Sequence, residues 1–209
     1  FQIKEEKILK PVNNLGYLGG FQFALRTLSE ANRKIILSNS DIEILNPSIL
    51  FDHPIEEKPR IIVPSVTNLD GIRQNPHLIS RPSKKFYQIR RFFSSNHYLW
   101  SMWSLASKIK TQASSLNTKN KSTIYAGHGS FLIFENTNLN SLITENYNFL
   151  FGEEIHFAEI ALNSNIPIEF NESIEIKHFE HASTSGIKDK FKVKFFHQSY
   201  KEILKRYYP

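Results

Sequence analysis

Short apolar runs alternate with longer amphipathic stretches along the chain. Runs rich in β-branched and aromatic residues are typical of strands, and they lie at 35–37, 60–66, 122–134, 166–170 and 173–179, the third interrupted by glycines. Apolar residues at helical spacing predict helices over 21–31, 83–110, 152–163 and 188–209. Because the strands alternate with helices, the pattern predicts an α/β fold.

The helix predicted over 152–163 contains one acidic residue that its pattern does not explain. Wound at about 100° per residue, the segment gathers other polar positions on one narrow stripe, formed by Gly152, His156, Glu159 and Asn163. Glu154 falls in the middle of the apolar face, whereas Glu153 lies at its edge, where a carboxylate suits the start of a helix. Burying a lone carboxylate costs several kcal/mol, so we expect Glu154 to face a pocket.

Length and composition suit a single domain, or a domain with an appendage. The chain has 209 residues, 40% of them hydrophobic, which is enough to bury a substantial core. It contains no cysteine, so disulfides and thiolate metal sites are excluded, which suits a reducing cytosol. No apolar run approaches the roughly 18 residues of a membrane span. We therefore expect a cytoplasmic protein with a main domain over 1–187 and a mobile polar loop near 110–122.

The net charge of +6 is concentrated near the end of the chain. Residues 188–209 hold seven basic and two acidic side chains, a local excess of five positive charges, interleaved with phenylalanine and tyrosine. Such a segment suits an anionic membrane surface or a polyanionic ligand. The pattern alone favours a simpler alternative, a C-terminal helix that packs its aromatic rings on the core and keeps its lysines in solvent.

Three sets of residues could carry chemistry. Asn39, Asp41 and Glu43 alternate at the end of a strand, where a carboxylate can hold Mg²⁺ or Mn²⁺; an exposed turn is the more common reason for such a pattern. His178 and His181 follow another strand, and an imidazole beside a carboxylate could complete a divalent-metal site. NLGYLGG (14–20) is a glycine-rich loop before a helix, a place where phosphate can bind.

Five segments occur in the order that a known family shows. They are NNLGYLGGFQFAL (13–25), ILSNSDIEI (36–44), GHGSFLIFE (127–135), FLFGEEIHFAEIALNSNIPIEF (149–170) and IKHFEHASTSG (176–186). Their order resembles that of the inverting family 2 glycosyltransferases, especially the bacterial rhamnosyltransferase-like members. The resemblance spans about residues 12–208, although 67–121 matches little. It implies a Rossmann-like GT-A fold, with a mixed sheet flanked by helices.

The resemblance also implies a donor site. Members of the family hold a nucleotide sugar through its diphosphate with a divalent metal. The segment NSD (39–41) matches their metal-binding motif, with Asn39 in place of its first aspartate, so Asp41 is the expected metal ligand and Asn39 is expected to contact ribose or phosphate. His178 matches the family histidine that can ligate the metal, and His181 is the alternative. Asn14 matches the donor-side loop.

The acceptor side follows from two other segments. GEE (152–154) matches the position where the family places its general base at the second acidic residue, which makes Glu154 the expected base and Glu153 its neighbour at the acceptor site. Gly127, His128 and Gly129 match a loop that lines this side. The implied reaction transfers a sugar to a hydroxyl of a saccharide or lipid-linked acceptor, with inversion, in bacterial surface polysaccharide synthesis at the inner face of the membrane.

The family pattern also has an opening strand and a nucleobase-binding strand, and nothing before Asn13 resembles them. We expect these strands to lie in a segment that precedes Phe1. The alternative is a non-catalytic carbohydrate- or nucleotide-binding relative, which the replacement at Asn39 also favours. Nucleic-acid binding is not expected, because no motif for it is present.

Overall fold

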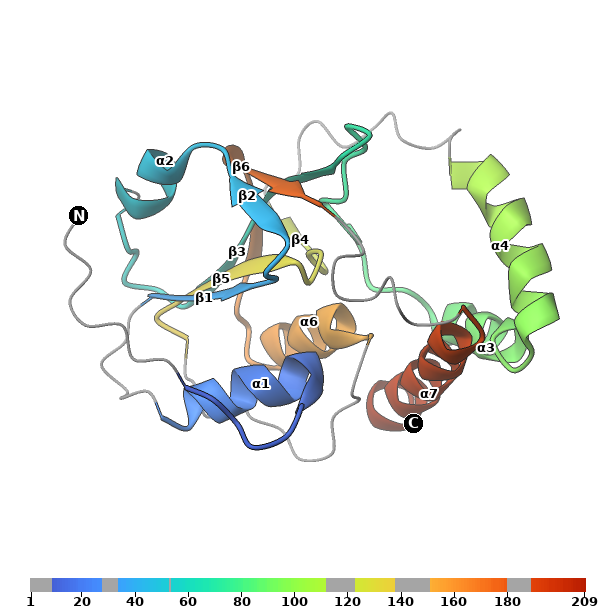
Figure 1. Cartoon of the computed structure of the whole chain (residues 1–209). Helices are drawn as coiled ribbons and strands as arrows, with labels where there is room; N and C mark the ends of the chain where they lie inside the picture. Colours follow the sequence, from blue (N-terminus) through green and yellow to red (C-terminus); the bar gives the residue numbers. More distant parts are fainter. Residues whose placement is uncertain (1–8, 28–33, 53, 112–122, 138–150, 180–188) are drawn as a thin grey trace.

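A mixed β-sheet forms the centre of the protein (Figure 1). The computed structural model describes residues 9–27, 34–52, 54–111, 123–137, 151–179 and 189–209. Within them the strands are β1 (Lys34–Ser38), β2 (Ile42–Ile44), β3 (Arg60–Asn68), β4 (Thr123–Ile124), β5 (Phe131–Glu135) and β6 (Ile168–His178). Their order is β1-β5-β3-β6-β2, with β4 also beside β6. The pair of β3 and β6 is parallel, and the other strand pairs are antiparallel.

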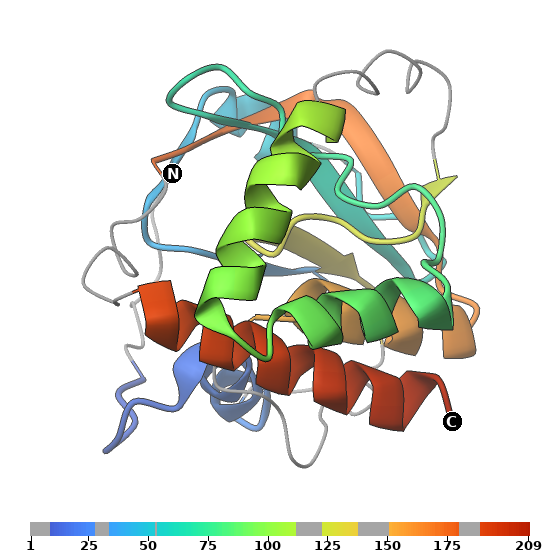
Figure 2. The ribbon, with the colours of Figure 1, turned by 90° about the vertical axis from the view of Figure 1, so that its right-hand side faces the viewer.

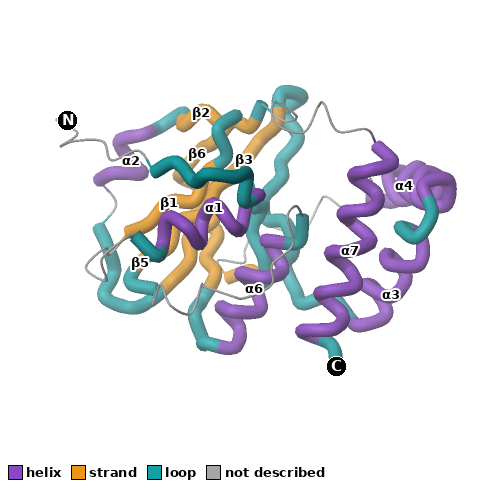
Figure 3. Tube along the Cα trace, turned by 60° about the horizontal axis from the view of Figure 1, so that its bottom comes forward, coloured by secondary structure: helices purple, strands orange, loops and turns teal. Residues whose placement is uncertain are grey.

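Both faces of the sheet are covered, as alternation along a buried strand requires. The described helices are α1 (Gly16–Leu25), α2 (Pro47–Asp52), α3 (Lys84–Phe93), α4 (His97–Thr111), α6 (Glu153–Asn163) and α7 (Asp189–Tyr207). In β5, Leu132 and Phe134 join the core beneath α1 and α6, whereas Phe131 and Ile133 join a second core that includes Leu50 of α2. Figure 3 shows α1 and α6 on the same side of the sheet. The predicted α/β class, a mixed sheet flanked by helices, is confirmed.

Three helices, α3, α4 and α7, pack together beside the sheet (Figure 2). Aromatic rings join them: Trp100 of α4 stacks on Phe196 of α7 at 5.3 Å, and Tyr87 of α3 lies 5.2 Å from Tyr208. Stacked rings of this kind add to the free energy gained from apolar burial. Within the described residues, no helix combines the length and the apolar character that crossing a bilayer requires.

Several predicted boundaries were wrong. The first helix begins at Gly16, within the glycine-rich segment, because Leu18, Phe21 and Leu25 are buried in the core, and this packing outweighs the low helix propensity of glycine. The stretch 83–110 forms two helices, α3 and α4, separated at 94–96. The strands predicted at 166–170 and 173–179 form the single strand β6, whose register with β3 shifts between Pro64 and Ser65. The pattern also missed the short elements β2 and α2.

The polar stripe predicted on α6 is not a solvent-facing stripe. His156 is 8% exposed and Glu159 only 2%, whereas Leu162, which lies outside the predicted polar stripe, is 51% exposed. Buried partners explain the difference. Arg81 Nε donates to Glu159 Oε1 at 2.7 Å and Tyr125 Oη donates to it at 2.5 Å.

Residues 112–122 of the loop predicted near 110–122 lie outside the described residues, and so does His181. The C-terminal helix is present as α7. Tyr200, Ile203 and Leu204 bury their side chains in the main core, whereas the basic side chains Lys190, Lys194, Lys201 and Lys205 are exposed. The packing is that of the simpler alternative, and the exposed lysines do not distinguish it from contact with an anionic surface.

Candidate functional site

Asp41 and His178 lie next to each other at one end of the sheet. His178 is the last residue of β6 and pairs in register with Ile42 of β2, which directly follows Asp41. The backbone N–H of Phe179 donates to the carbonyl of Asp41 at 2.8 Å and fixes the two segments together. His178 Nε2 is 3.5 Å from Asp41 Oδ1, and both side chains are buried.

The two ring nitrogens of His178 have different neighbours. His178 Nδ1 lies 2.8 Å from Gln74 Oε1, an acceptor, so Nδ1 carries the hydrogen and Nε2 of the neutral ring is left as an acceptor. Asn39 Nδ2 lies 3.3 Å from Nε2 and donates to it. Asp41 Oδ1 is buried beside Nε2 and has no hydrogen-bond partner. A buried carboxylate oxygen without a donor is a position where a cation can bind.

This pair fits the divalent metal that the sequence resemblance implies. A carboxylate and an imidazole whose second nitrogen donates to a neighbour are typical metal ligands. No cluster of three or more such side chains is found among the described residues. Mg²⁺ commonly takes only one or two protein carboxylates and completes its shell with water and substrate phosphate, so Asp41 and His178 could hold it together with a diphosphate.

A loop before β5 connects this pair to a second cluster. The ring of His128 lies 5.5 Å from the ring of His178. Its backbone N–H donates to Asn75 Oδ1 at 2.6 Å, and its Nδ1 lies 2.9 Å from Ser130 Oγ, so the loop is held at both sides. The predicted acceptor-side residue His128 therefore adjoins the predicted metal ligand.

The next residue of the loop, Gly129, meets the two glutamates at the start of α6. Its N–H points at Glu154 Oε1 over 3.4 Å, and its carbonyl accepts a hydrogen bond from the hydroxyl of Tyr17. A Cβ at this position would lie 3.0 Å from Glu153 Cγ and 3.3 Å from Glu154 Oε1. The loop backbone thus lies close to both carboxylates, and a larger residue at this position would have to shift their side chains.

Burial and mutual repulsion act on this carboxylate pair. Desolvation raises the pKa of Glu153 well above its usual range, and the nearby charge of Glu154 raises it further. Burial and the same two carboxylates raise the pKa of Tyr17. Tyr17 therefore stays protonated and remains a hydrogen-bond donor to Gly129. A pair of neighbouring carboxylates in which one is readily protonated is typical of functional sites.

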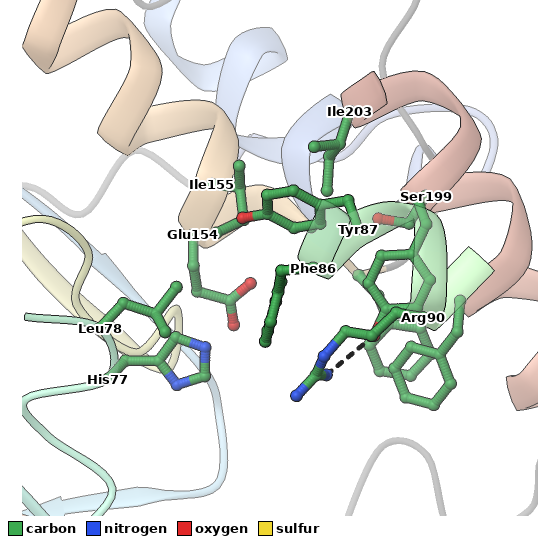
Figure 4. Close-up of a pocket in the computed structure, with 13 residues that line it drawn as sticks. His77, Leu78, Phe86, Tyr87, Arg90, Glu154, Ile155, Ser199 and Ile203 are labelled. Atoms are coloured by element: carbon green, nitrogen blue, oxygen red, sulfur yellow. Dashed lines mark hydrogen bonds between the residues drawn. The ribbon is translucent and has the colours of Figure 1, made fainter. Parts of the chain in front are cut away.

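Glu154 also lines a cavity of about 300 Å³ between α3, α6 and α7 (Figure 4). The close-up shows Glu154 and Arg90 pointing into the same space, with His77 at one side. Glu153 does not line it. The expectation that Glu154 faces a pocket is confirmed, and the cavity is large enough for one sugar-sized ligand.

The backbone at the start of α6 is strained where it forms this cavity. Phe151 has φ of 65° and Gly152 has φ of 94°, both in the left-handed region. Phe151 nevertheless stacks on Phe196 at 4.3 Å between ring centroids. A non-glycine residue in this conformation costs about 1 kcal/mol or more and is often found at ligand sites.

Four of the predicted site residues have other local contacts. Asn14 is exposed at the start of α1, where its Oδ1 accepts from the N–H of Gly16 at 2.9 Å. Gly127 packs directly against Val63. Asn39 lies beside the predicted metal ligands, and its Nδ2 is 3.3 Å from His178 Nε2. Glu43, the reserve candidate, is exposed on β2 in register with Lys177.

The sequence pattern missed several residues that the fold adds to the site. Gln74 and Arg90 come from segments without a distinctive motif, and Tyr17 lies in the glycine-rich segment 14–20 but was not singled out there. Asn75 precedes a proline, which was the only local signal of a tight turn among them. Models of known protein families give no match to the chain, and no curated protein matches it either.

Proposed function

We propose that the protein is an inverting glycosyltransferase with a GT-A-type fold. It moves a sugar from a nucleotide-sugar donor to a hydroxyl of a saccharide or lipid-linked acceptor. One observation carries the proposal. His178, which pairs with Asp41, lies beside His128. The next residue of the same loop, Gly129, contacts Glu154. One loop therefore connects the proposed metal ligands to the carboxylate that faces the cavity. A donor diphosphate and an acceptor hydroxyl could thus be bound within one site.

In this proposal Glu154 is the general base. The acceptor hydroxyl attacks the anomeric carbon of the donor, a C–O bond forms, and the bond from that carbon to the diphosphate oxygen breaks. The hydroxyl proton passes to Glu154, and the nucleoside diphosphate leaves. Gly129 N–H holds Glu154 in the orientation that faces the cavity.

Asp41 and His178 would hold the donor diphosphate through Mg²⁺ or Mn²⁺, which offsets the negative charge of the leaving group when bound. Asn39 would contact ribose or phosphate. The side chain of Gln74 keeps the hydrogen of His178 on Nδ1, so that Nε2 remains available as a ligand atom.

A non-catalytic binding protein of the same fold is the second candidate, and one contact favours it. The amide of Asn39 lies 3.3 Å from the His178 nitrogen that a metal would need. A metal has to displace this contact, which weakens its binding. The two functions differ in whether a metal increases the affinity for nucleotide and whether transfer follows.

The proposed base is tested by Glu154→Gln, which keeps shape and loses the proton acceptor. We expect loss of transfer by about 100-fold or more, with donor affinity nearly unchanged, measured by release of nucleoside diphosphate from a panel of nucleotide sugars. Glu57→Gln, the same change at an exposed position, is the control. Substantial turnover by the Glu154→Gln protein would exclude Glu154 as the base.

The donor site is tested by thermal unfolding with nucleotide sugars, with and without Mn²⁺. A ligand at 100 times its Kd stabilises the folded state by about 2.7 kcal/mol. We expect the shift to require both Mn²⁺ and Asp41, and therefore to disappear in Asp41→Asn. A metal-independent shift without turnover would favour the non-catalytic alternative.

We propose a cytoplasmic location, with peripheral contact at the inner face of the membrane. The exposed lysines of α7 support it, because they form a cationic stripe along the solvent side of that helix. A lipid-linked acceptor would be presented at the same surface.

A further inference from the structure

The cavity beside Glu154 contains an arginine without a carboxylate partner. Arg90 extends from α3, and its guanidinium carbon lies 4.5 Å from the ring centroid of Phe86 and 5.0 Å from that of Trp103. One nitrogen, Nη1, donates to Tyr200 Oη at 3.2 Å. Nε is buried and has no hydrogen-bond partner. Aromatic faces stabilise the charge of Arg90 without neutralising it.

Other arginines that reach the interior are neutralised. Arg60 lies 2.8 Å from Glu135 and Arg81 lies 2.7 Å from Glu159, both buried carboxylates. Among the described residues, no carboxylate comes within the 4.0 Å ion-pair distance of Arg90, Glu154 across the cavity included. A half-buried cation in such a place is expected to bind an anion.

The ring of Tyr87 forms part of the cavity wall, and its hydroxyl does not open into the cavity. Tyr87 is 1% exposed, and its hydroxyl makes no hydrogen bond. Burial, with the neighbouring Tyr208 and Glu159, raises the pKa of Tyr87, so the hydroxyl keeps its proton. The charged groups that point into the cavity are therefore Arg90 and Glu154.

Aromatic rings form much of the remaining lining, together with the polar side chains of His77 and Ser199. Phe86, Phe151 and Phe196 contribute rings to the lining, and Glu154 contributes the carboxylate that accepts a hydroxyl proton in the proposed reaction. Aromatic walls with a few polar groups are typical of small-ligand sites, and they suit the apolar face of a sugar ring.

We infer that this cavity binds an acidic saccharide, a sugar whose carboxylate or phosphate pairs with Arg90 while a hydroxyl faces Glu154. The inference rests on the proposed function for the role of the bound sugar as acceptor. The guanidinium offers Nη2, which Tyr200 does not use, and such charge-assisted bonds are stronger than neutral ones. A neutral sugar would leave the charge of Arg90 without an anionic partner.

Binding is measured on the full chain by intrinsic tryptophan fluorescence, because Trp103 lies against Arg90. The probes are glucuronic acid, glucose 6-phosphate, glucose and inorganic phosphate, at physiological ionic strength and without donor or metal. We expect one of the two acidic sugars to bind about tenfold tighter than glucose, which corresponds to one charge-assisted hydrogen bond. The acid that binds tighter identifies the anionic group.

Two variants test whether the preference for an acidic sugar comes from Arg90 or from the positive charge of the protein as a whole. Arg90→Gln should remove the preference for the acidic sugar, and Arg91→Gln, an exposed neighbour on the same helix, should retain it. If Arg90→Gln fails to fold, Arg90→Lys replaces it, with a preference reduced by about threefold or more.

Equal affinity for glucose and both acidic sugars would overturn the inference, as would inorganic phosphate binding as tightly as glucose 6-phosphate. Because no donor is present, the result is independent of turnover. Preference for an acidic sugar together with transfer by Glu154→Gln would reject only the proposed base.

Discussion

Two glycines near the site occupy positions where a side chain would collide with a neighbouring residue. At Gly127 a Cβ would lie 2.4 Å from Cγ2 of Val63, a fully buried residue of β3. At Gly152 it would lie 2.2 Å from Ser199 Oγ, and the backbone has a positive φ. Gly20 has no atom within 4 Å of the same position. The requirement for glycine thus differs between positions that the sequence presents alike.

Gly127→Ala should lower the free energy of unfolding by about 2 kcal/mol, because the buried valine can move only by displacing its strand. Gly20→Ala, in the middle of α1, should instead raise it by about 0.5 to 1 kcal/mol, since alanine is the better helix former. Urea denaturation of the two variants measures both changes. Equal stability of the Gly127→Ala protein and the wild type would contradict the packing described here.

At the scale of elements, buried polar contacts join α6 to its neighbours. Glu159 pairs with Arg81, whose Nη2 also donates to the carbonyl of Tyr207 at 2.8 Å. His156 Nδ1 is hydrogen-bonded to the hydroxyl of Tyr207 at the end of α7. Breaking such a contact leaves a buried polar group without a partner, so these contacts fix how α6 sits against α7.

The contact of His156 predicts a pH dependence. Burial, with a smaller effect of Arg206, lowers the pKa of His156 to about 4. Between that value and the ordinary histidine pKa of about 6.5, the unfolded chain binds a proton that the folded protein does not. Stability therefore decreases as the pH is lowered, and His156 accounts for about 2 kcal/mol of this decrease between about pH 7 and about pH 5.

Glu153 contributes with the opposite sign. Its raised pKa stabilises the folded state at low pH, and this contribution is lost as the pH rises through the folded pKa. The measurement is therefore a comparison of urea denaturation for the wild type and His156→Gln at both pH values. The stability difference between these two proteins should change by about 2 kcal/mol. Parallel curves would show that His156 does not titrate as described.

At the scale of the whole molecule, α7 has two functions in the fold. One side carries Tyr200, Ile203 and Leu204 into the main core. The opposite side presents lysines spaced by four, seven and four residues, a regular stripe on a helix: Lys190, Lys194, Lys201 and Lys205. Most of the aromatic rings of the tail thus pack inward, and any attraction to a membrane comes from charge.

This predicts binding that depends on lipid charge. The chain should sediment with vesicles that contain phosphatidylserine and not with neutral ones, and each basic residue near the surface contributes about 1 kcal/mol. Reversing Lys194, Lys201 and Lys205 to glutamate should weaken the partition by more than about tenfold, with an unchanged far-UV circular dichroism spectrum. Equal binding of this variant would place the contact on another surface.

The sequence by itself determined those features that depend on neighbours along the chain. Alternation and helical spacing predicted β3, β5, α6 and α7, because each buries a face that its own residues define. The same spacing identified Glu154 as a carboxylate on an apolar face, and the structure places it at the cavity.

Only the tertiary structure decided which distant groups meet. Gln74 orients His178 across 104 residues, and Tyr17 reaches Gly129 across 112. Arg90 gained importance only when the fold placed it at a cavity with Tyr200, and no carboxylate of the described residues, as its hydrogen-bond partner. Glu159 and His156 of α6 are buried for the same reason, because Arg81 and Tyr207 provide their hydrogen-bond partners. A hydrogen bond or ion pair is decided by distance in space, which spacing along the chain does not contain.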